Sequence, residues 1–465
     1  MNDATRWDDP PPEDETEAPL PAQFSEDNLA RHWVLRHGKD WRYVAQSQSW
    51  FKWCGDRWKP ERTIEAFELA RNITREALMW DGIGKAERLR VNSARTASAM
   101  LQFVRADRKI AATLEQWDCD PWLLGVPGGV VNLKSCEVIP AQREQYITKQ
   151  TAVAPATGNP ERWLAFLERI TNGNTDITAY LHRFTGYCLT GETSEHALAF
   201  LYGTGANGKT TFVQALLGIL GDYGITAPIE TFAESKNERH STELARLRGA
   251  RMVATEETSI GSRWNESRIK TLTGGNRISA RFMRQDDFEY QPEFKLLIAG
   301  NHKPQMRSVD EAMKRRMHIV PFTVTIPEHE RDTGLQAALQ AEYPQILKWA
   351  IEGCYAWRNG ALGAPEVIRN ATETYLKSND VLGAWLDERC DLEGQQEGKV
   401  LYADFAKWCE EHGETVWKRR GWSDAMFDKG FGDFRRRIGG TLIRGFTGVK
   451  LRLSASQPHS MNSNT

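Results

Sequence analysis

Short apolar runs alternate with helical patterns through the middle of the chain. Helical periodicity occupies residues 163–170, 177–184 and 212–220, and runs of the buried-strand type occupy residues 197–202, 250–255, 294–300 and 317–322. Alternation of this kind is typical of a largely parallel sheet that is covered by helices. We therefore predict an α/β core over residues 159–330.

The pattern changes on the N-terminal side of this core. Residues 1–27 combine acids and prolines with few large apolar residues, which predicts a disordered acidic tail. Residues 28–158 hold aromatic strands near residues 41–58, then helical patterns and a compact β element, which predicts an α+β domain. The aromatic side chains favour a small core under a hairpin, and stacking on nucleic-acid bases is the alternative.

On the C-terminal side, we expect a helical lid and linker at residues 331–392, a winged-helix-like domain at residues 393–453 and a polar tail at residues 454–465. The winged-helix pattern consists of a helix near residues 401–409, a second helix from residue 423 to residue 438, and a hairpin with a glycine turn at residues 441–453. Arg435, Arg436 and Arg437 would end the second helix and face DNA phosphates. A solvated charged module without DNA contacts is the alternative.

Composition limits the classes of function. The 465 residues include 60 basic and 62 acidic ones, so net charge gives no argument for nucleic-acid binding and any such surface must be local. Seven cysteines form no C-x-x-C pair, and only Cys409 has a histidine, His412, within one helical turn. This predicts neither a disulfide framework nor a zinc site and favours a reducing cytoplasm. Since no apolar run approaches ~20 residues and the N-terminus is acidic, we expect a soluble intracellular protein without a membrane span.

The most specific motif lies between the strand at residues 197–202 and the helix that follows. Gly203, four further residues, and then Gly208, Lys209 and Thr210 have the spacing of a P-loop. Glycines allow backbone N–H groups to turn toward phosphate oxygens, and the start of the helix adds its positive dipole end. Lys209 would reach the β- and γ-phosphates of ATP, and Thr210 would bind Mg²⁺; a glycine-rich turn without a ligand is the alternative. The predicted nucleotide-binding residues are Gly203, Gly205, Asn207, Gly208, Lys209, Thr210 and Thr211.

Polar residues follow the later strands. Glu256 and Glu257 end the strand at residues 250–255 and could divide two roles, one near Mg²⁺ and one that orients the attacking water. We expect Glu256 to serve the metal; an acidic strand end in a solvated turn is the alternative. Asn301 ends the next strand, where an amide could touch the γ-phosphate or the lytic water.

Two adjacent arginines, Arg315 and Arg316, precede the strand at residues 317–322. An arginine supplied by a neighbouring subunit can stabilise the charge of the transition state for phosphoryl transfer. A solvated basic helix end is the alternative. Residues 270–292 alternate polar and apolar positions about a polar tip, which predicts a β-hairpin.

Several of these pieces together resemble superfamily 3 helicases, and closely the poxvirus- and phage/plasmid-type primase-helicase family. The resemblance covers roughly residues 115–375 and includes short pieces at residues 121–123, 131–133 and 184–192. Its main motifs are Gly-Thr-Gly-Ala-Asn-Gly-Lys-Thr at 203–210, Gly-Ala-Arg-Met-Val-Ala-Thr-Glu-Glu at 249–257, Lys-Thr-Leu-Thr-Gly-Gly-Asn at 270–276, Leu-Leu-Ile-Ala-Gly-Asn-His-Lys-Pro at 296–304 and Asp-Glu-Ala-Met-Lys-Arg-Arg at 310–316.

The resemblance implies an AAA+ core that forms a homo-hexameric ring on single-stranded or forked DNA, with ATP and Mg²⁺ between subunits. It implies Glu257 as the retained glutamate, Asn301 as a sensor, and Arg315 or Arg316 as a finger that acts in trans. The motif that contains Lys270, Arg281 and Arg284 is associated in this family with the central DNA channel.

The chain departs from the family in its first 150 or so residues, which lack the paired-acid strand pattern or zinc cluster of a primase. We therefore expect an ATP-dependent DNA helicase of a phage, prophage or plasmid replication system that works with a separate primase. Two alternatives are a protein-remodelling AAA+ ATPase, favoured by Phe282 in the channel motif, and an ATP-switched origin-binding protein without processive unwinding.

Overall fold

The computed structural model describes residues 21–233, 242–256, 263–281, 287–306, 311–438 and 441–452. The chain divides into two compact units: residues 1–119 with 140–148, and residues 120–139 with 149–465. The β element at residues 120–139 groups with the second unit, so the expected boundary at residue 158 lies inside that unit. None of the helices in the described ranges is long and apolar enough to cross a membrane.

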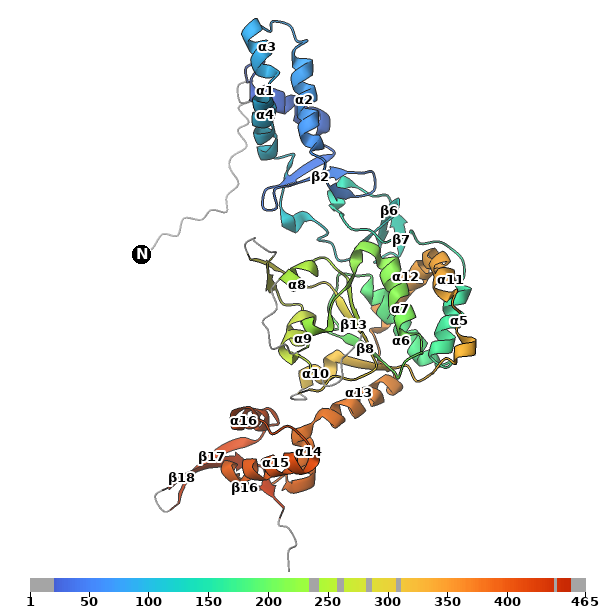
Figure 1. Cartoon of the computed structure of the whole chain (residues 1–465), viewed down its shortest axis with the longest axis vertical. Helices are drawn as coiled ribbons and strands as arrows, with labels where there is room; N and C mark the ends of the chain where they lie inside the picture. Colours follow the sequence, from blue (N-terminus) through green and yellow to red (C-terminus); the bar gives the residue numbers. More distant parts are fainter. Residues whose placement is uncertain are drawn as a thin grey trace, which may run out of the picture. The chain divides into compact units, whose positions relative to one another are not determined.

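The first unit is a small sheet, in the order β3-β2-β1-β4, with helices packed against it (Figure 1). Trp41 on β1 and Trp50 on β2 are buried beside Trp33 of α1, with ring centroids 5.7–5.9 Å apart. The preferred interpretation of these aromatic residues, a small core, is therefore confirmed. The elements are α1 (Glu26–His37), β1 (Trp41–Val44), β2 (Ser49–Trp53), β3 (Trp58–Pro60), α2 (Glu65–Ala77), α3 (Lys85–Val91), α4 (Ala94–Ala106) and β4 (Ala111–Ala112).

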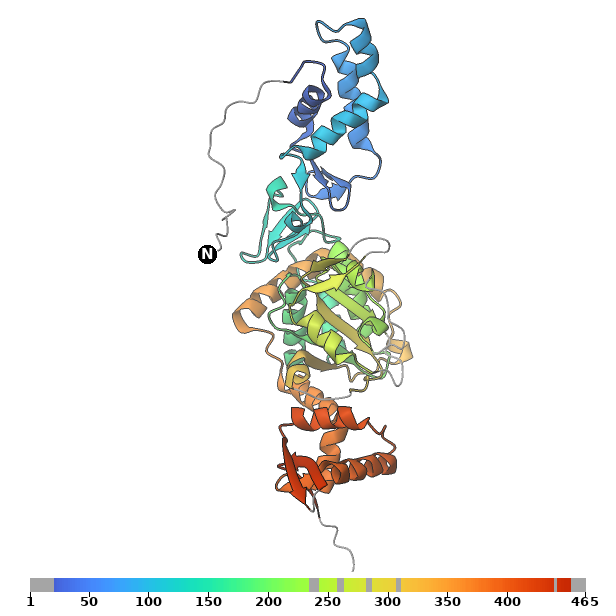
Figure 2. The same ribbon diagram turned by 90° about the vertical axis from the view of Figure 1, so that its left-hand side faces the viewer.

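The second unit is built on a five-stranded parallel sheet in the order β14-β8-β13-β10-β9 (Figure 2). The sheet confirms the predicted α/β core with its parallel strands. Because β13 lies between β8 and β10, the ends of these three strands meet at one edge. The strands are β8 (Leu198–Tyr202), β9 (Gly224–Thr226), β10 (Met252–Glu256), β13 (Lys295–Gly300) and β14 (Met317–Pro321).

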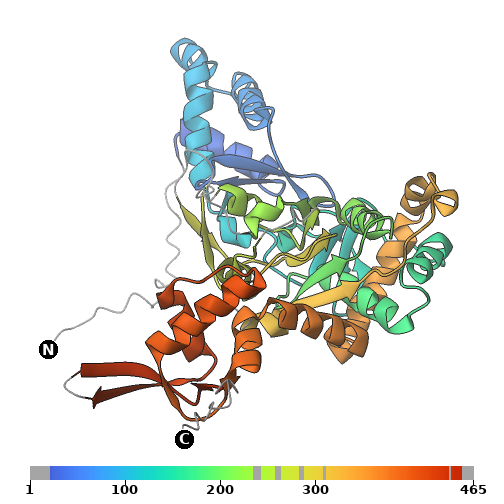
Figure 3. The same cartoon turned by 60° about the horizontal axis from the view of Figure 1, so that its bottom comes forward.

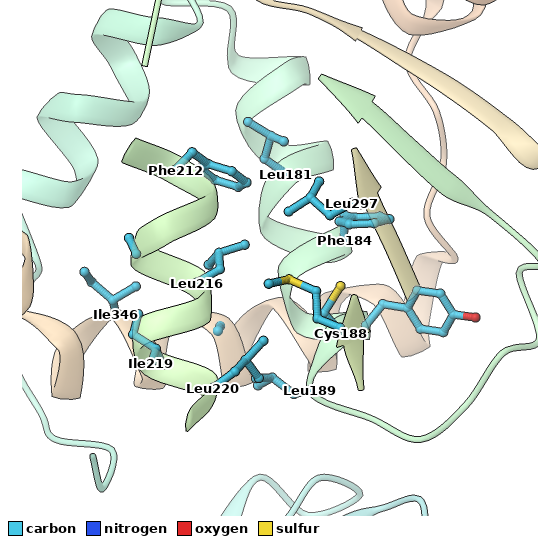
Figure 4. Close-up of a cluster of buried hydrophobic side chains, with 14 of the residues drawn as sticks. Leu181, Phe184, Cys188, Leu189, Phe212, Leu216, Ile219, Leu220, Leu297 and Ile346 are labelled. Atoms are coloured by element: carbon cyan, nitrogen blue, oxygen red, sulfur yellow. The ribbon is translucent and has the colours of Figure 1, made fainter. Parts of the chain in front are cut away.

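Helices cover both faces of this sheet because its strands are apolar at nearly every position. Ala199 and Leu201 of β8 point into one cluster, and Leu198 and Phe200 point into the other, as the two-residue period of a strand requires. On the first face, Phe212, Leu216 and Ile219 of α7 pack among residues of α6, α12 and β13 (Figure 4). The helices of this face are α5 (Glu161–Ile170), α6 (Thr175–Cys188), α7 (Lys209–Leu220), α11 (Leu335–Ala341) and α12 (Tyr343–Gly360), with the small sheet β5 (Leu123–Val126), β6 (Gly129–Asn132) and β7 (Glu137–Ile139) beside them.

The second face is covered by four helices and a pair of short strands among the described residues. Ile269 and Leu272 of α9, Met313 of α10 and Leu376 of α13 are buried against it. The elements are α8 (Thr242–Arg246), α9 (Glu266–Thr273), the antiparallel pair β11 (Ile278–Ala280) and β12 (Phe288–Tyr290), α10 (Glu311–Arg316) and α13 (Glu366–Asn379).

The predicted hairpin over residues 270–292 is correct only in its second part. Residues 278–280 and 288–290 form the pair β11–β12, but Lys270 lies in helix α9. Asn265 caps this helix by accepting a hydrogen bond from the Arg268 N–H at 3.0 Å. Alternation of polar and apolar residues therefore identified the strands but placed their start too early.

A buried cation lies at the amino edge of the parallel sheet. Lys295, the first residue of β13, is 2% exposed, and its Nζ donates to the carbonyl oxygens of Thr190, Glu192 and Glu293. Its ammonium also lies 4.8 Å from the ring centroid of Tyr187. Burial lowers the pKa of Lys295 to about 7.

The C-terminal part packs helices against a small antiparallel sheet in the order β16-β18-β17. Its core contains Trp385, Leu401, Phe405, Trp422 and Phe446. The elements are α14 (Val381–Arg389), β15 (Cys390–Asp391), β16 (Gln395–Glu397), α15 (Gly398–His412), α16 (Arg419–Asp428), β17 (Gly432–Ile438), β18 (Thr441–Thr447) and β19 (Lys450–Leu451).

Two predictions for this part were wrong. Arg435, Arg436 and Arg437 do not end a helix, because α16 stops at Asp428 and these residues lie on strand β17. The hairpin is not contained in residues 441–453 either, because the partner of β18 is β17, which begins at Gly432, and Ile438 lies opposite Thr441. In the sequence only two residues, both glycines, separate these strands, a spacing that is typical of a hairpin.

Candidate functional site

The loop between β8 and α7 has the backbone of a phosphate cradle. Gly205, Ala206 and Gly208 all have left-handed φ angles, of +109°, +48° and +83°. A Cβ on Gly208 would lie 2.4 Å from Ile170 Cγ2, and one on Gly203 would lie 2.2 Å from the Phe322 carbonyl oxygen. Both positions therefore need glycine, and the loop can turn its N–H groups toward an anion at the start of α7.

Lys209 lies at the centre of this loop. Its side chain is 5% exposed, and its Nζ donates to the Gly203 carbonyl at 2.8 Å, to Asn207 Oδ1 at 2.9 Å and to Asn301 Oδ1 at 3.0 Å. All three acceptors are neutral, and among the residues that the structure describes no carboxylate pairs with this ammonium. Burial lowers the pKa of Lys209. An anion placed beside it would be stabilised by the unneutralised charge.

Two amides hold Lys209 in place. Asn207 is 2% exposed, and its Nδ2 donates to the Phe322 carbonyl oxygen at 3.2 Å, which fixes Oδ1 toward the lysine. Asn301 follows β13, the strand that pairs with β8. The structure thus brings together the P-loop lysine and the amide that the sequence placed at the end of a neighbouring strand.

The acidic residues follow the next strand at the same edge. Glu256 is the last residue of β10, and its backbone pairs with Ala299 of β13. The next residue of β13, Gly300, pairs with Tyr202 at the end of β8, so β8 and β10 end at the same edge. Its side chain lies outside the described part of the structure, as does the whole of Glu257. Within the described ranges no group of three or more His, Cys, Asp or Glu residues could hold a metal ion.

The two threonines after Lys209 differ in their surroundings. Thr210 is exposed in the first turn of α7. Thr211 is half-buried and lines a cavity of about 500 Å³ next to the loop. The Thr210 hydroxyl is therefore free to contribute to a Mg²⁺ site that also uses phosphate oxygens and a carboxylate.

The cavity beside the loop was not predicted from the sequence. Its size suits a nucleobase and ribose, since ligand pockets of this class begin at ~300 Å³. Arg169 pairs with Glu330 at 2.5 Å and Arg162 with Asp332 at 3.0 Å among its walls. No local motif marks these residues, because the walls come from α5, the loop and residues 326–335. The lining consists of Arg162, Ala165, Phe166, Arg169, Ala206, Gly208, Thr211, Ile326, Glu330, Arg331, Asp332 and Leu335.

Arg315 and Arg316 lie at the opposite edge of the sheet from Lys209. They end α10, and the next residue, Met317, pairs with Leu198 at the beginning of β8. The length of β8, roughly 13 Å, thus separates them from the loop. Arg316 is half-buried, with Nε donating to Thr273 Oγ1 at 3.1 Å and Nη1 to the Ala312 carbonyl at 2.9 Å. Arg315 is exposed and has no carboxylate partner among the described residues.

The basic residues predicted to bind DNA lie in three different elements. Lys270 is on helix α9, and Arg281 follows β11 as an exposed residue with its Nε 3.8 Å from Asp287 Oδ1. Arg284 and Phe282 lie outside the described residues. Arg435, Arg436 and Arg437 are exposed on β17.

Comparison with family models places two known regions on the chain. A model described as D5 N terminal like matches residues 30–172. A second, described as a family of unknown function (DUF5906), matches residues 201–316, which include the loop, Asn301 and both arginines of α10. The first match begins well before residue 115, so the likeness reaches further toward the N-terminus than the motifs alone indicate.

Similar curated proteins come from large DNA viruses. The chain is 29% identical over 266 residues to a candidate helicase of Acanthamoeba polyphaga mimivirus, which covers 52% of this chain and 28% of that protein. It is 24% identical over 318 residues to a candidate primase of African swine fever virus, which covers 62% of this chain and 32% of that protein. The chain thus spans a third or less of the length of these relatives.

A solved structure resembles the fold of nearly the whole chain. The apo structure of the NrS-1 C terminal region has a TM-score of 0.52 at 10% identity and covers 91% of this chain and 99% of that one. At this identity the likeness concerns the fold alone.

Proposed function

Because the chain belongs to the primase-helicase family of phages and large DNA viruses, we propose that it is an ATP hydrolase and works as a replicative DNA helicase. The observation that carries the proposal is the buried Lys209 ammonium, which the loop and Asn301 surround with three neutral oxygens. A cation held in this way at a helix start suits the phosphates of ATP.

The residues around the loop fit ATP and Mg²⁺. The glycines and Asn207 shape the cradle, Lys209 neutralises the β- and γ-phosphates, and Thr210 and Glu256 serve the metal. Bound Mg²⁺ would neutralise part of the negative charge of the phosphates. Glu257 orients the attacking water and accepts its proton. Asn301 contacts the γ-phosphate and holds it in position. The cavity beside Thr211 receives the base and ribose.

The site is completed by a second copy of the chain. Arg315 and Arg316 lie a strand length away from Lys209, so within one chain they do not reach its loop. We assign Arg315 as the finger because its guanidinium is exposed and, in the part of the chain that the structure describes, has no carboxylate partner. Arg316 positions the end of α10 through its bonds to Thr273 and Ala312. This arrangement supports a closed ring of identical subunits. In the proposal the ring is a homo-hexamer, and each subunit has an AAA+ core of the superfamily 3 type.

Single-stranded DNA passes through the ring in this proposal. Lys270, Arg281 and Arg284 supply the positive charge of the channel. The C-terminal part supports a winged-helix-like assignment, because helices α14, α15 and α16 pack against a sheet whose middle strand, β18, joins β16 to β17. A separate primase would supply primers.

The test is to measure ATP hydrolysis and unwinding of a forked duplex on the same preparation, with and without single-stranded DNA. We expect single-stranded DNA to raise the ATPase rate and unwinding to require ATP. Hydrolysis that is insensitive to DNA and produces no unwinding would contradict the helicase and favour an ATP-switched binding protein.

A further inference from the structure

The hairpin β17–β18 extends beyond the core of the C-terminal part. Its base is fixed by Phe446, which is 5% exposed and contacts the rings of Trp422 and Phe427. Strand β16 pairs with β18 only from Thr447 to Gly445, so beyond Gly445 the ribbon has two strands. Figure 3 shows this end of the ribbon pointing away from helices α15 and α16.

The two-stranded end carries four exposed arginines: Arg435, Arg436, Arg437 and Arg444. In the described residues, the one carboxylate within 4.0 Å of their side-chain nitrogens is that of Asp433, whose Oδ2 lies 3.8 Å from Arg435 Nε. Within the described ranges, Arg436, Arg437 and Arg444 pair with no carboxylate. The ribbon therefore presents a net positive charge that the described residues do not neutralise.

The register sets three of these charges on one face. Arg435 lies directly opposite Arg444, and Arg437 follows two residues later on the same face of β17. Like charges placed directly opposite each other on two strands destabilise the pair, since their Cβ atoms are ~5 Å apart. An anion that lies between the guanidinium groups would remove this repulsion. Arg436 points to the other face of the ribbon.

We propose that the two-stranded end of the β17–β18 hairpin binds the phosphate backbone of duplex DNA. Guanidinium groups suit phosphate because they can donate two parallel hydrogen bonds. A two-stranded ribbon fits the major groove of B-DNA, where charge on both faces can meet both backbones. Among the described residues of the ribbon, no aromatic side chain is fully exposed for stacking on unpaired bases, since Phe434 is half-buried and Phe446 is buried, which favours duplex over single-stranded DNA.

This inference rests on the proposed function in one respect: a replicative helicase meets duplex DNA ahead of the strands that it separates. The hairpin would hold that duplex by its backbone, without reading its sequence. Binding through the hairpin needs neither ATP nor the P-loop, so it can be measured in the absence of nucleotide.

The experiment measures binding of the full chain to a blunt duplex and to one of its single strands by fluorescence anisotropy, over a series of salt concentrations without nucleotide. The test variant is Arg435→Gln/Arg444→Gln. The control is Lys399→Gln/Lys407→Gln, which removes the same charge from exposed positions of α15. We expect the test variant to bind the duplex about tenfold more weakly and to lower the slope of log K against log salt by about 2, because two phosphate contacts are lost.

Three further outcomes decide the proposal. Arg435→Lys/Arg444→Lys should retain most of the duplex affinity, since it keeps the charge, and a loss in this variant as large as that in the glutamine variant would overturn the proposal. Equal loss in the control variant, or loss of single-strand binding alone, would overturn the proposal. An ATPase-dead Lys209→Ala protein should bind the duplex normally, and so a failure of the hairpin and a failure of the helicase assignment are distinguishable.

Discussion

Two lysines are buried at opposite edges of the same parallel sheet, and they differ in the loop and the space around them. Lys209 at the carboxyl edge is 5% exposed, and Lys295 at the amino edge is 2% exposed. Each ammonium is surrounded by three neutral oxygens, and burial lowers the pKa of both. The lysines thus look alike when judged by burial and hydrogen bonding alone.

The difference lies in what surrounds the two ammonium groups. Lys209 follows a loop with left-handed glycines and begins a helix, next to a cavity of about 500 Å³. Lys295 donates only to carbonyl oxygens of nearby loops and lies over the Tyr187 ring. A buried cation therefore indicates a binding site only where the backbone also offers N–H groups and space to an anion.

The largest expected effect is the loss of hydrolysis in Lys209→Ala. Removing the ammonium that neutralises the β- and γ-phosphates should lower kcat at least 100-fold, while Tm changes little. The control is Lys303→Ala, which removes another partly buried lysine at the same edge, 4.1 Å from the ring centroid of Tyr202. Steady-state ATPase assays should show a much smaller loss in the control, and equal losses would contradict the special role of Lys209.

Almost as large an effect is expected at the end of β10. Glu257→Gln should bind ATP normally but slow turnover about 100-fold or more, because the amide cannot accept a proton from the attacking water. Glu256→Gln should mainly weaken the response to Mg²⁺. Nucleotide binding and single-turnover hydrolysis separate these cases, and the reverse result would exchange the roles of the two glutamates.

The third prediction concerns the arginines at the amino edge. Arg315→Ala should lower kcat by about 100-fold or more, because it removes the finger from the neighbour's site. Mixing Lys209→Ala chains with Arg315→Ala/Arg316→Ala chains should restore part of the ATPase activity, since some interfaces then pair an intact loop with intact arginines. No recovery on mixing, or full activity of a dilute monomer, would contradict the trans arrangement.

The smallest expected effect on activity comes from Lys295→Met, which should change stability instead. Removing the donor leaves three carbonyl oxygens without their partner, so we expect a loss of about 2–4 kcal/mol with kcat nearly unchanged. Lys348→Met is the control, because Lys348 is a more exposed lysine of α12. Urea unfolding and ATPase assays of both variants would sharpen the contrast with Lys209.

The same lysine predicts how stability depends on pH. The pKa of Lys295 is about 7 in the folded chain, against about 10.4 when unfolded. Between these values the unfolded state binds the extra proton, so stability should rise from pH 7 toward pH 10 and fall as pH drops through 7. Lys295→Met should lose this part of the slope. An unchanged slope in the variant would show that Lys295 is not the titrating group.

Elements that are marked by a local pattern in the sequence could be predicted from it. The loop at Lys209 and the strands that end at Glu256 and Gly300 were predicted from glycine spacing and apolar runs. The helix predicted to end at Arg435–Arg437 was wrong, because a run of arginines between apolar residues fits the end of a helix as well as a strand. The neglected signal was the glycine pair between two alternating runs, which is typical of a tight hairpin turn.

Other features could not be read from any single segment. The order of the strands, which places β13 between β8 and β10, depends on the packing of the whole sheet. The cavity near Thr211 combines Phe166 of α5 with Ile326 and Leu335, which are separated by about a third of the chain. Arg169 and Glu330 are far apart in the sequence, and they form an ion pair only because the fold brings their segments together.

Strand β17 has a further consequence for the behaviour of the protein in solution. It lies at the edge of the sheet β16-β18-β17, and within the described residues its outer edge pairs with no strand. A seven-residue open edge is a template on which another chain can add a strand and begin to aggregate. Three consecutive arginines put charge on both faces of this strand, and two molecules that approached each other edge to edge would bring these charges together. We therefore expect the arginines to oppose edge-to-edge pairing of two β17 strands as well, and variants that neutralise them should be handled at low concentration and checked for aggregates by light scattering.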